Sequence, residues 1–289
     1  MLFTILILAL FELSIILHEL GHAFAMRQCG VRVVRISLFG FPGLGFISVP
    51  FTIRLPIKAR WLPDTEWVIH PLLPLGAYVE PNEEDAARVS RAEDLYISGM
   101  GALANFIFGL ALIFLTAGLA PEWFVTKGTV TSEMLYTGLL IGIVAAMWAL
   151  WRYRVFFCRR LLLAVGIVCL VLVAVTIAFM TDAERIEMLA GFGFLVGIRD
   201  IYIWSQALTG HGVRDIIAYA LVMSGYLSIA LGALNLMPLL PLDGGHMMNH
   251  YVPGVLRKPY LTVSVILIYP LLVIALWNDA VFLTRLLWA

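Results

Sequence analysis

The chain has 289 residues, of which 62% are hydrophobic and 13% are charged, and its mean hydropathy is +0.95. Because soluble domains carry about 25% charged residues, this composition indicates a polytopic membrane protein. The 19 basic and 19 acidic residues give a formal net charge of zero, and this balance argues against nucleic acid as a partner.

The first predicted element is an apolar helix over about residues 2–26, long enough to span a membrane. It contains His18-Glu19-Leu20-Gly21-His22, which fits the pattern H-E-x-x-H. Histidines four residues apart lie on one face of a helix and suit two ligands of a tetrahedral Zn²⁺. Glu19 is then placed to take a proton from a metal-bound water. The alternative is two histidines packed at a helix end beside a surface glutamate.

A second carboxyl, Glu12, lies in the same helix, seven residues before Glu19 and on nearly the same face. An ionisable residue inside a membrane segment is a candidate functional residue. We interpret Glu12 as a protonated carboxyl that is hydrogen-bonded inside the bundle, rather than as a group that takes part in chemistry.

The stretch that follows is less apolar and predicts a small β region. Residues 31–38 are rich in β-branched side chains, which is typical of a strand. Glycines and a proline over residues 40–45 predict a turn before an apolar run over residues 46–55, so we expect a membrane-associated hairpin. Residues 74–79 predict another short strand, and residues 80–93 a solvated loop or surface helix.

A second spanning helix is predicted over about residues 95–119. It opens with Gly99, Gly101 and Ala102, which we interpret as packing positions because small residues let helices approach closely. Asn105 follows, and because a buried amide needs a partner, it is a candidate functional residue.

Two further spans are predicted over about residues 134–151 and 161–180. The loop between them has no acid and four arginines: Arg152, Arg154, Arg159 and Arg160. The positive-inside rule places this loop in the cytosol, so the N-terminus lies outside and the zinc motif lies near the cytosolic face. Residues 181–215 predict an interfacial amphipathic segment, in which His211 is more simply a surface residue than a ligand.

The next span is predicted over about residues 216–237, and it runs into the sequence NLMPLLPLDGGH over residues 235–246. Its two prolines break the backbone hydrogen-bond ladder, and its two glycines permit a turn. Asp243 follows this break and, by the same count, lies on the side of the zinc motif, where it can supply a third zinc ligand. A last span is predicted over about residues 261–277.

We therefore expect an all-α polytopic membrane protein, with about six transmembrane helices and a small membrane-associated β-hairpin region after the first helix. Residues 1–289 are predicted to form a single integral membrane domain. Residues 1–119 hold the H-E-x-x-H helix, the hairpin region and the second helix. Residues 120–215 hold the inserted helices and the amphipathic segment, and residues 216–289 the Asp243 helix and the last helix.

The H-E-x-x-H motif at residues 18–22, together with N-x-x-P-x-x-P-L-D-G at residues 235–244, resembles the site-2 protease family of intramembrane zinc metalloproteases. Three flanking pieces resemble its bacterial RseP-type branch: residues 29–33 (CGVRV), 74–79 (PLGAYV) and 101–106 (GALANF). Ala77 and Ala102 stand where that branch has glycine and proline. No PDZ-like stretch separates the second helix from the Asp243 helix.

The resemblance implies hydrolysis of peptide bonds in or near transmembrane segments of membrane proteins, with Zn²⁺ as the cofactor. It implies that His18, His22 and Asp243 bind zinc and that Glu19 is the general base.

The resemblance also implies a substrate site and a location. Asn235 and Asn105 are the candidate substrate-binding residues, and the hairpin over residues 46–54 would pair with an unwound substrate strand. The expected substrate is a single-pass transmembrane protein in the bacterial inner membrane, and the helices over residues 134–180 are a candidate contact for an accessory membrane partner.

Two other functions stay open. A membrane H-E-x-x-H protease of another class would use a glutamate in place of Asp243, so the metal content of Asp243→Ala and Glu187→Ala variants would separate the two. A non-catalytic transporter or binding protein could use Glu12 and the broken helix for ion passage, and would hold no zinc.

Overall fold

The structure is a computed structural model. It describes residues 2–38, 52–69, 76–120, 201–202, 205–206, 208–267, 281 and 284. The spans predicted over residues 134–151 and 161–180 lie outside the described residues, as do the arginine loop between them and most of the amphipathic segment.

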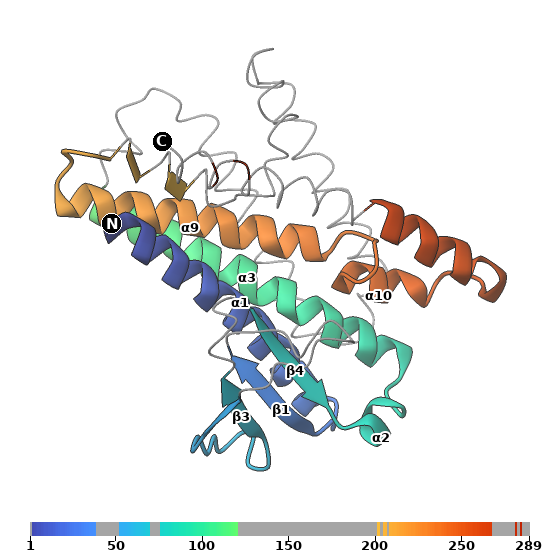
Figure 1. Ribbon diagram of the computed structural model, residues 1–289. Coiled ribbons are helices and arrows are strands. Elements are labelled where there is room, and N and C mark those ends of the chain that lie inside the picture. The colour runs from blue at the N-terminus through green and yellow to red at the C-terminus, as the bar shows by residue number, and fades with distance from the viewer. Residues whose placement is uncertain are drawn as a thin grey trace.

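Three long helices form the frame of the molecule: α1 (Leu2–Gln28), α3 (Arg91–Leu119) and α9 (Val213–Asn235). Each is long and apolar enough to cross a membrane, and the three lie side by side (Figure 1). They correspond to three of the predicted spans, with ends that differ by about one helical turn. The total of six crossings stays a prediction. Of the last predicted span, residues 261–267 are described, and they are helical.

Small and polar residues allow the three helices to pack closely. A Cβ atom on Gly109 would lie 2.6 Å from the carbonyl oxygen of Gly225, so the backbones of α3 and α9 touch there. The hydroxyl of Ser14 on α1 donates to Ser228 on α9 at 2.7 Å, and Ser228 donates to the carbonyl of Asn105 on α3 at 2.8 Å. These bonds tie all three helices together.

The start of α3 is set by a local signal. Ser90 and Glu93 form a capping box, in which each side chain accepts a hydrogen bond from the backbone amide of the other. This box satisfies amides that have no partner within the helix, so α3 begins at Arg91, earlier than predicted. Before it lies only a short helix, α2 (Glu83–Ala86).

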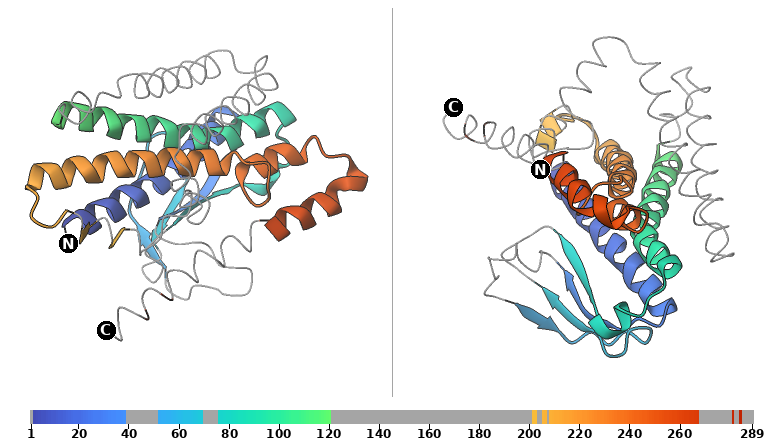
Figure 2. Two further views of the ribbon diagram at one scale, coloured as in Figure 1. Left: turned by 90° about the horizontal axis from the view of Figure 1, so that it is seen from above. Right: turned by 90° about the vertical axis from the view of Figure 1, so that its right-hand side faces the viewer.

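The chain between α1 and α3 forms a four-stranded sheet from β1 (Val33–Leu38), β2 (Ile53–Leu55), β3 (Glu66–Ile69) and β4 (Ala77–Pro81). The strand order is β2-β3-β1-β4. Strand β1 pairs parallel with β3 and antiparallel with β4, and β2 pairs antiparallel with β3. The sheet lies on the opposite side of α1 from α9 (Figure 2).

The predicted hairpin between residues 31–38 and 46–55 is therefore wrong, because β3 lies between β1 and β2. The reason is burial. Trp67 and Val68 of β3 are buried and need covered positions in the sheet, whereas Ile53 and Arg54 of β2 are exposed and suit an edge. The small β region expected after the first helix is present, but it is a mixed four-stranded sheet rather than a hairpin.

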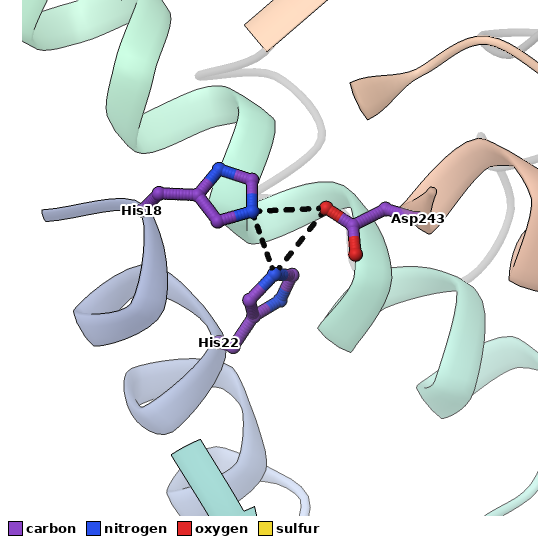
Figure 3. A group of neighbouring side chains, drawn as sticks. All are labelled: His18, His22 and Asp243. Atoms are coloured by element: carbon purple, nitrogen blue, oxygen red, sulfur yellow. Dashed lines mark hydrogen bonds and ion pairs between the residues drawn. The ribbon is translucent and has the colours of Figure 1, made fainter. Parts of the chain in front are cut away.

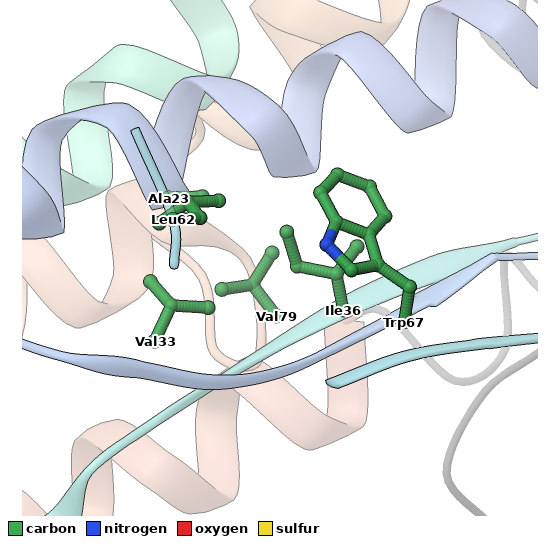
Figure 4. Close-up of a cluster of buried hydrophobic side chains, with 6 residues drawn as sticks. All are labelled: Ala23, Val33, Ile36, Leu62, Trp67 and Val79. Atoms are coloured by element: carbon green, nitrogen blue, oxygen red, sulfur yellow. The ribbon is translucent and has the colours of Figure 1, made fainter. Parts of the chain in front are cut away.

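One face of the sheet packs against the C-terminal half of α1 (Figure 4). The buried side chains of this cluster come from α1, three strands and a loop: Ala23, Val33, Ile36, Leu62, Trp67 and Val79. Ile36 is fully buried at its centre. Burial of this apolar surface attaches the sheet to the same turns of α1 that carry the H-E-x-x-H motif.

Candidate metal centre

His18 and His22 lie one turn apart on α1 and are both buried. Their Nε2 atoms are 3.1 Å apart, and both imidazoles point toward the start of α10 (Asp243–Asn249) (Figure 3). The helical spacing of the motif therefore places two nitrogen atoms at one point, as the sequence predicts.

Asp243 reaches the same point from the other end of the chain. Helix α9 ends at Asn235, and α10 begins at Asp243 after a turn. Gly244 and Gly245 make this turn possible, because a Cβ on either would clash with the backbone of Leu236 or Leu239. Asp243 Oδ2 consequently lies 3.1 Å from His18 Nε2 and 3.3 Å from His22 Nε2 (Figure 3).

The triangle of these three atoms fits a zinc ion. Zinc binds nitrogen and oxygen at about 2.0–2.1 Å in tetrahedral geometry, which separates its ligand atoms by about 3.3 Å. The observed separations are 3.1, 3.1 and 3.3 Å. Within the described part of the chain, His18, His22 and Asp243 form the one such group and no fourth side chain joins it. Three protein ligands with one open position are typical of catalytic zinc.

Helix α3 orients one of the imidazoles. The Nδ1 atom of His22 is 2.8 Å from the carbonyl oxygen of Ile97. A carbonyl can only accept, so Nδ1 carries the hydrogen and Nε2 keeps a lone pair for a metal. One turn along α3, a Cβ on Gly101 would lie 2.6 Å from His22 Cε1 and 2.7 Å from His18 Cε1. Helix α3 thus approaches both rings at a residue without a side chain.

Glu19 lies between the two histidines in sequence and faces β4. Its carboxyl is close to His18, His22 and Asp243, and also to the backbone amide of Val79. The site therefore places a carboxyl beside the three candidate metal ligands.

Residues 5–277 match the family model of peptidase family M50. The chain belongs to this family, the site-2 proteases. The resemblance drawn from the two motifs is confirmed.

Curated site-2 protease relatives match only part of the chain. A protein of Neisseria meningitidis named as a zinc metalloprotease is 35% identical over 123 residues, which cover 38% of this chain and 24% of that protein. The regulator of sigma-E protease RseP of Escherichia coli is 35% identical over 112 residues, or 33% of this chain and 21% of RseP. The match thus spans about a quarter or less of the relatives' length.

Other candidate residues lie in different places within this member of the site-2 protease family. Asn105 is fully buried between α3 and α9, and Asn235 is the last, half-buried residue of α9. Substrate contact by either stays a prediction. His211 is exposed and lies outside the group of candidate ligands.

Sequence reasoning missed Gly101 and the Ile97 carbonyl. Gly101 was interpreted as a packing position like Gly99, although it alone belongs to the piece over residues 101–106 that resembles the RseP-type branch. A Cβ on Gly99 would meet only the end of Met247, at 3.8 Å. Only the approach of α1 shows which glycine faces the histidines.

Proposed function

We propose that this chain is an intramembrane zinc metalloprotease that hydrolyses peptide bonds in or near transmembrane segments of membrane proteins. The observation that carries the proposal is the meeting of His18, His22 and Asp243 within 3.3 Å of one another, beside Glu19 and among helices that can span a membrane. Membership of the site-2 protease family supports the same function.

The proposed chemistry divides between the three ligands and one base. His18, His22 and Asp243 would hold Zn²⁺, which when bound activates water and polarises a peptide carbonyl. Glu19 takes a proton from the attacking water and later donates it to the leaving amine. The Glu19 carboxyl lies close to these three residues and to the backbone amide of Val79 on β4.

The substrate must be extended at the cleavage site. A transmembrane helix hides its carbonyls in internal hydrogen bonds, so the target has to unwind locally. Strand addition to a sheet edge could hold it extended. Within the described residues, β2 is such an edge strand, and it is the described part of the segment predicted to pair with substrate.

We propose a single-pass transmembrane protein as substrate and the bacterial inner membrane as location. The arginine loop over residues 152–160 supports an N-terminus outside the cell and an active site near the cytosolic face. The apolar segments over residues 134–180 are a candidate contact for an accessory membrane partner.

A Glu19→Gln variant tests the chemistry. The amide cannot take a proton from water, so we expect cleavage to fall by at least about a hundredfold while zinc content stays unchanged. The measurements are zinc per chain in purified protein and cleavage of a model substrate, namely one apolar transmembrane helix between two soluble tags.

The matched control is Glu84→Gln on the exposed face of α2, which should cleave as the wild type does. Undiminished turnover by Glu19→Gln would remove this residue from the mechanism. Absence of zinc from the wild type, together with ion flux in liposomes, would favour the transporter instead.

A further inference from the structure

Glu12 is a buried carboxyl that the proposed mechanism does not use. It lies within the span of α1 and is 5% exposed. Its Oε2 atom accepts a hydrogen bond of 3.0 Å from the backbone amide of Gly76. Gly76 has a φ of +114°, a conformation that other residues rarely adopt, and it directly precedes β4.

Strand β4 runs alongside the part of α1 between Glu12 and Glu19. Seven residues of helix and three residues of extended chain both cover about 10 Å. The amide of Gly76 donates to Glu12, and the amide of Val79, three residues on, lies close to Glu19. Two carboxyls on one face of α1 thus lie along one stretch of backbone.

The rest of the sheet supports this alignment. Ala77 and Val79 pair with Leu38 and Ile36 of β1, and both side chains are buried. The pairing with β1 orients β4 within the sheet, whereas the bond to Glu12 ties the start of β4 directly to the helix that carries the motif. The position of the Val79 amide depends on both attachments.

Because Glu12 is buried, its bond to Gly76 favours one position of β4 along α1. A carboxyl or an amide without a partner is costly at membrane depth, because neither water nor lipid replaces the missing hydrogen bond. The bond between Glu12 and Gly76 gives a partner to the amide and to one oxygen of the carboxyl. Displacing β4 along α1 would separate them, so the bond favours one alignment of strand on helix.

We propose that Glu12 is a positioning residue, whose carboxyl holds the start of β4 on α1 and thereby keeps the Val79 amide at the carboxyl of Glu19. This proposal rests on the proposed function for its effect on catalysis. It does not rest on it for the attachment of β4, which can be measured separately.

The test compares Glu12→Met with Glu12→Gln. Methionine has nearly the same length but offers no strong acceptor, so the amides of residues 76–80 should exchange with deuterium about tenfold faster. Glutamine keeps an acceptor oxygen and should exchange as the wild type does. Zinc content should be unchanged in both variants, and the rate of model-substrate cleavage at saturation should fall about tenfold in Glu12→Met alone.

The control is Ser14→Ala, which removes a buried hydrogen bond on the same helix but toward α9, and should leave exchange in β4 unchanged. A second variant without an acceptor, Glu12→Ala, should behave as Glu12→Met does. Wild-type exchange in β4 of both of these variants would overturn the proposal, as would equally fast exchange in Glu12→Gln. A wild type that holds no zinc and cleaves nothing would refute the proposed function, while the exchange rates would still decide the role of Glu12.

Discussion

At the scale of single residues, the candidate metal centre depends on the backbone carbonyl of Ile97 and on Gly101, which has no side chain. In helix α3 the carbonyl of Ile97 is one turn before Gly101, and it has lone pairs for both its helical bond and His22 Nδ1. Because Cβ atoms in a helix point toward its N-terminus, a side chain at position 101 would lie over that carbonyl and against both imidazoles.

A Gly101→Ala variant should therefore lose zinc. The added Cβ would lie 2.6 Å from His22 Cε1 and 2.7 Å from His18 Cε1, so the rings must turn away from the ligand geometry. Loss of a group that orients a metal ligand costs about 10–100-fold in affinity, and competition with a chelator would measure this loss.

Gly118→Ala is the matched control. It lies on the same helix, and its Cβ would meet nothing within 4 Å. Zinc affinity should be unchanged there. Wild-type affinity in Gly101→Ala would show that the two rings can shift without cost.

At the scale of elements, the position of Asp243 depends on how α10 docks. A helix of seven residues is not stable alone, so its place is set by its contacts. Beyond its C-terminal end, His250 pairs with Asp94 and the ring of Tyr251 lies 3.8 Å from the guanidinium of Arg91. Both partners belong to the first turn of α3, the helix that also orients His22.

Removing this docking should weaken zinc binding without touching a ligand. We expect a double variant, Arg91→Ala with Asp94→Ala, to lower zinc affinity about threefold, because both contacts are partly exposed and each is weak. The measurement is again chelator competition. Arg88→Ala, an exposed position just before α3, is the control, and an equal fall there would exclude docking as the cause.

At the scale of the whole molecule, the candidate metal centre links two helices that lie more than two hundred residues apart in the sequence. It joins α1 to α10, and α3 packs against both of these elements. An ion that binds only the folded state stabilises it in proportion to the logarithm of its concentration over the dissociation constant. Zinc would thus act as a cross-link between segments far apart in sequence.

Chelation should consequently lower the thermal midpoint of the wild type in detergent. A dissociation constant about a hundredfold below the free zinc concentration corresponds to about 2.7 kcal/mol of stability. Asp243→Ala should start from a lower midpoint and show no further fall with the chelator. Equal falls in both proteins would place the stabilising ion somewhere else.

Local features of the sequence determined the spanning helices of this protein and the position of the two histidines. Apolar runs predicted α1, α3 and α9, because a membrane span is a property of one continuous segment. The spacing of His18 and His22 alone placed two imidazoles on one face, because helix geometry relates residues four apart. The break in the helix after Asn235 predicted that Asp243 lies on the same side of the membrane as the two histidines.

Tertiary structure decided which elements meet. Strand β1 pairs with β3 rather than β2, and no alternation of side chains specifies a partner. Gly101 faces the histidines, whereas Gly99 does not. Glu12 accepts a hydrogen bond from the amide of Gly76, which is 64 residues away in the sequence. These contacts depend on the packing of whole helices and strands, whose free energy is spread over many residues and leaves no periodic signal in any one segment.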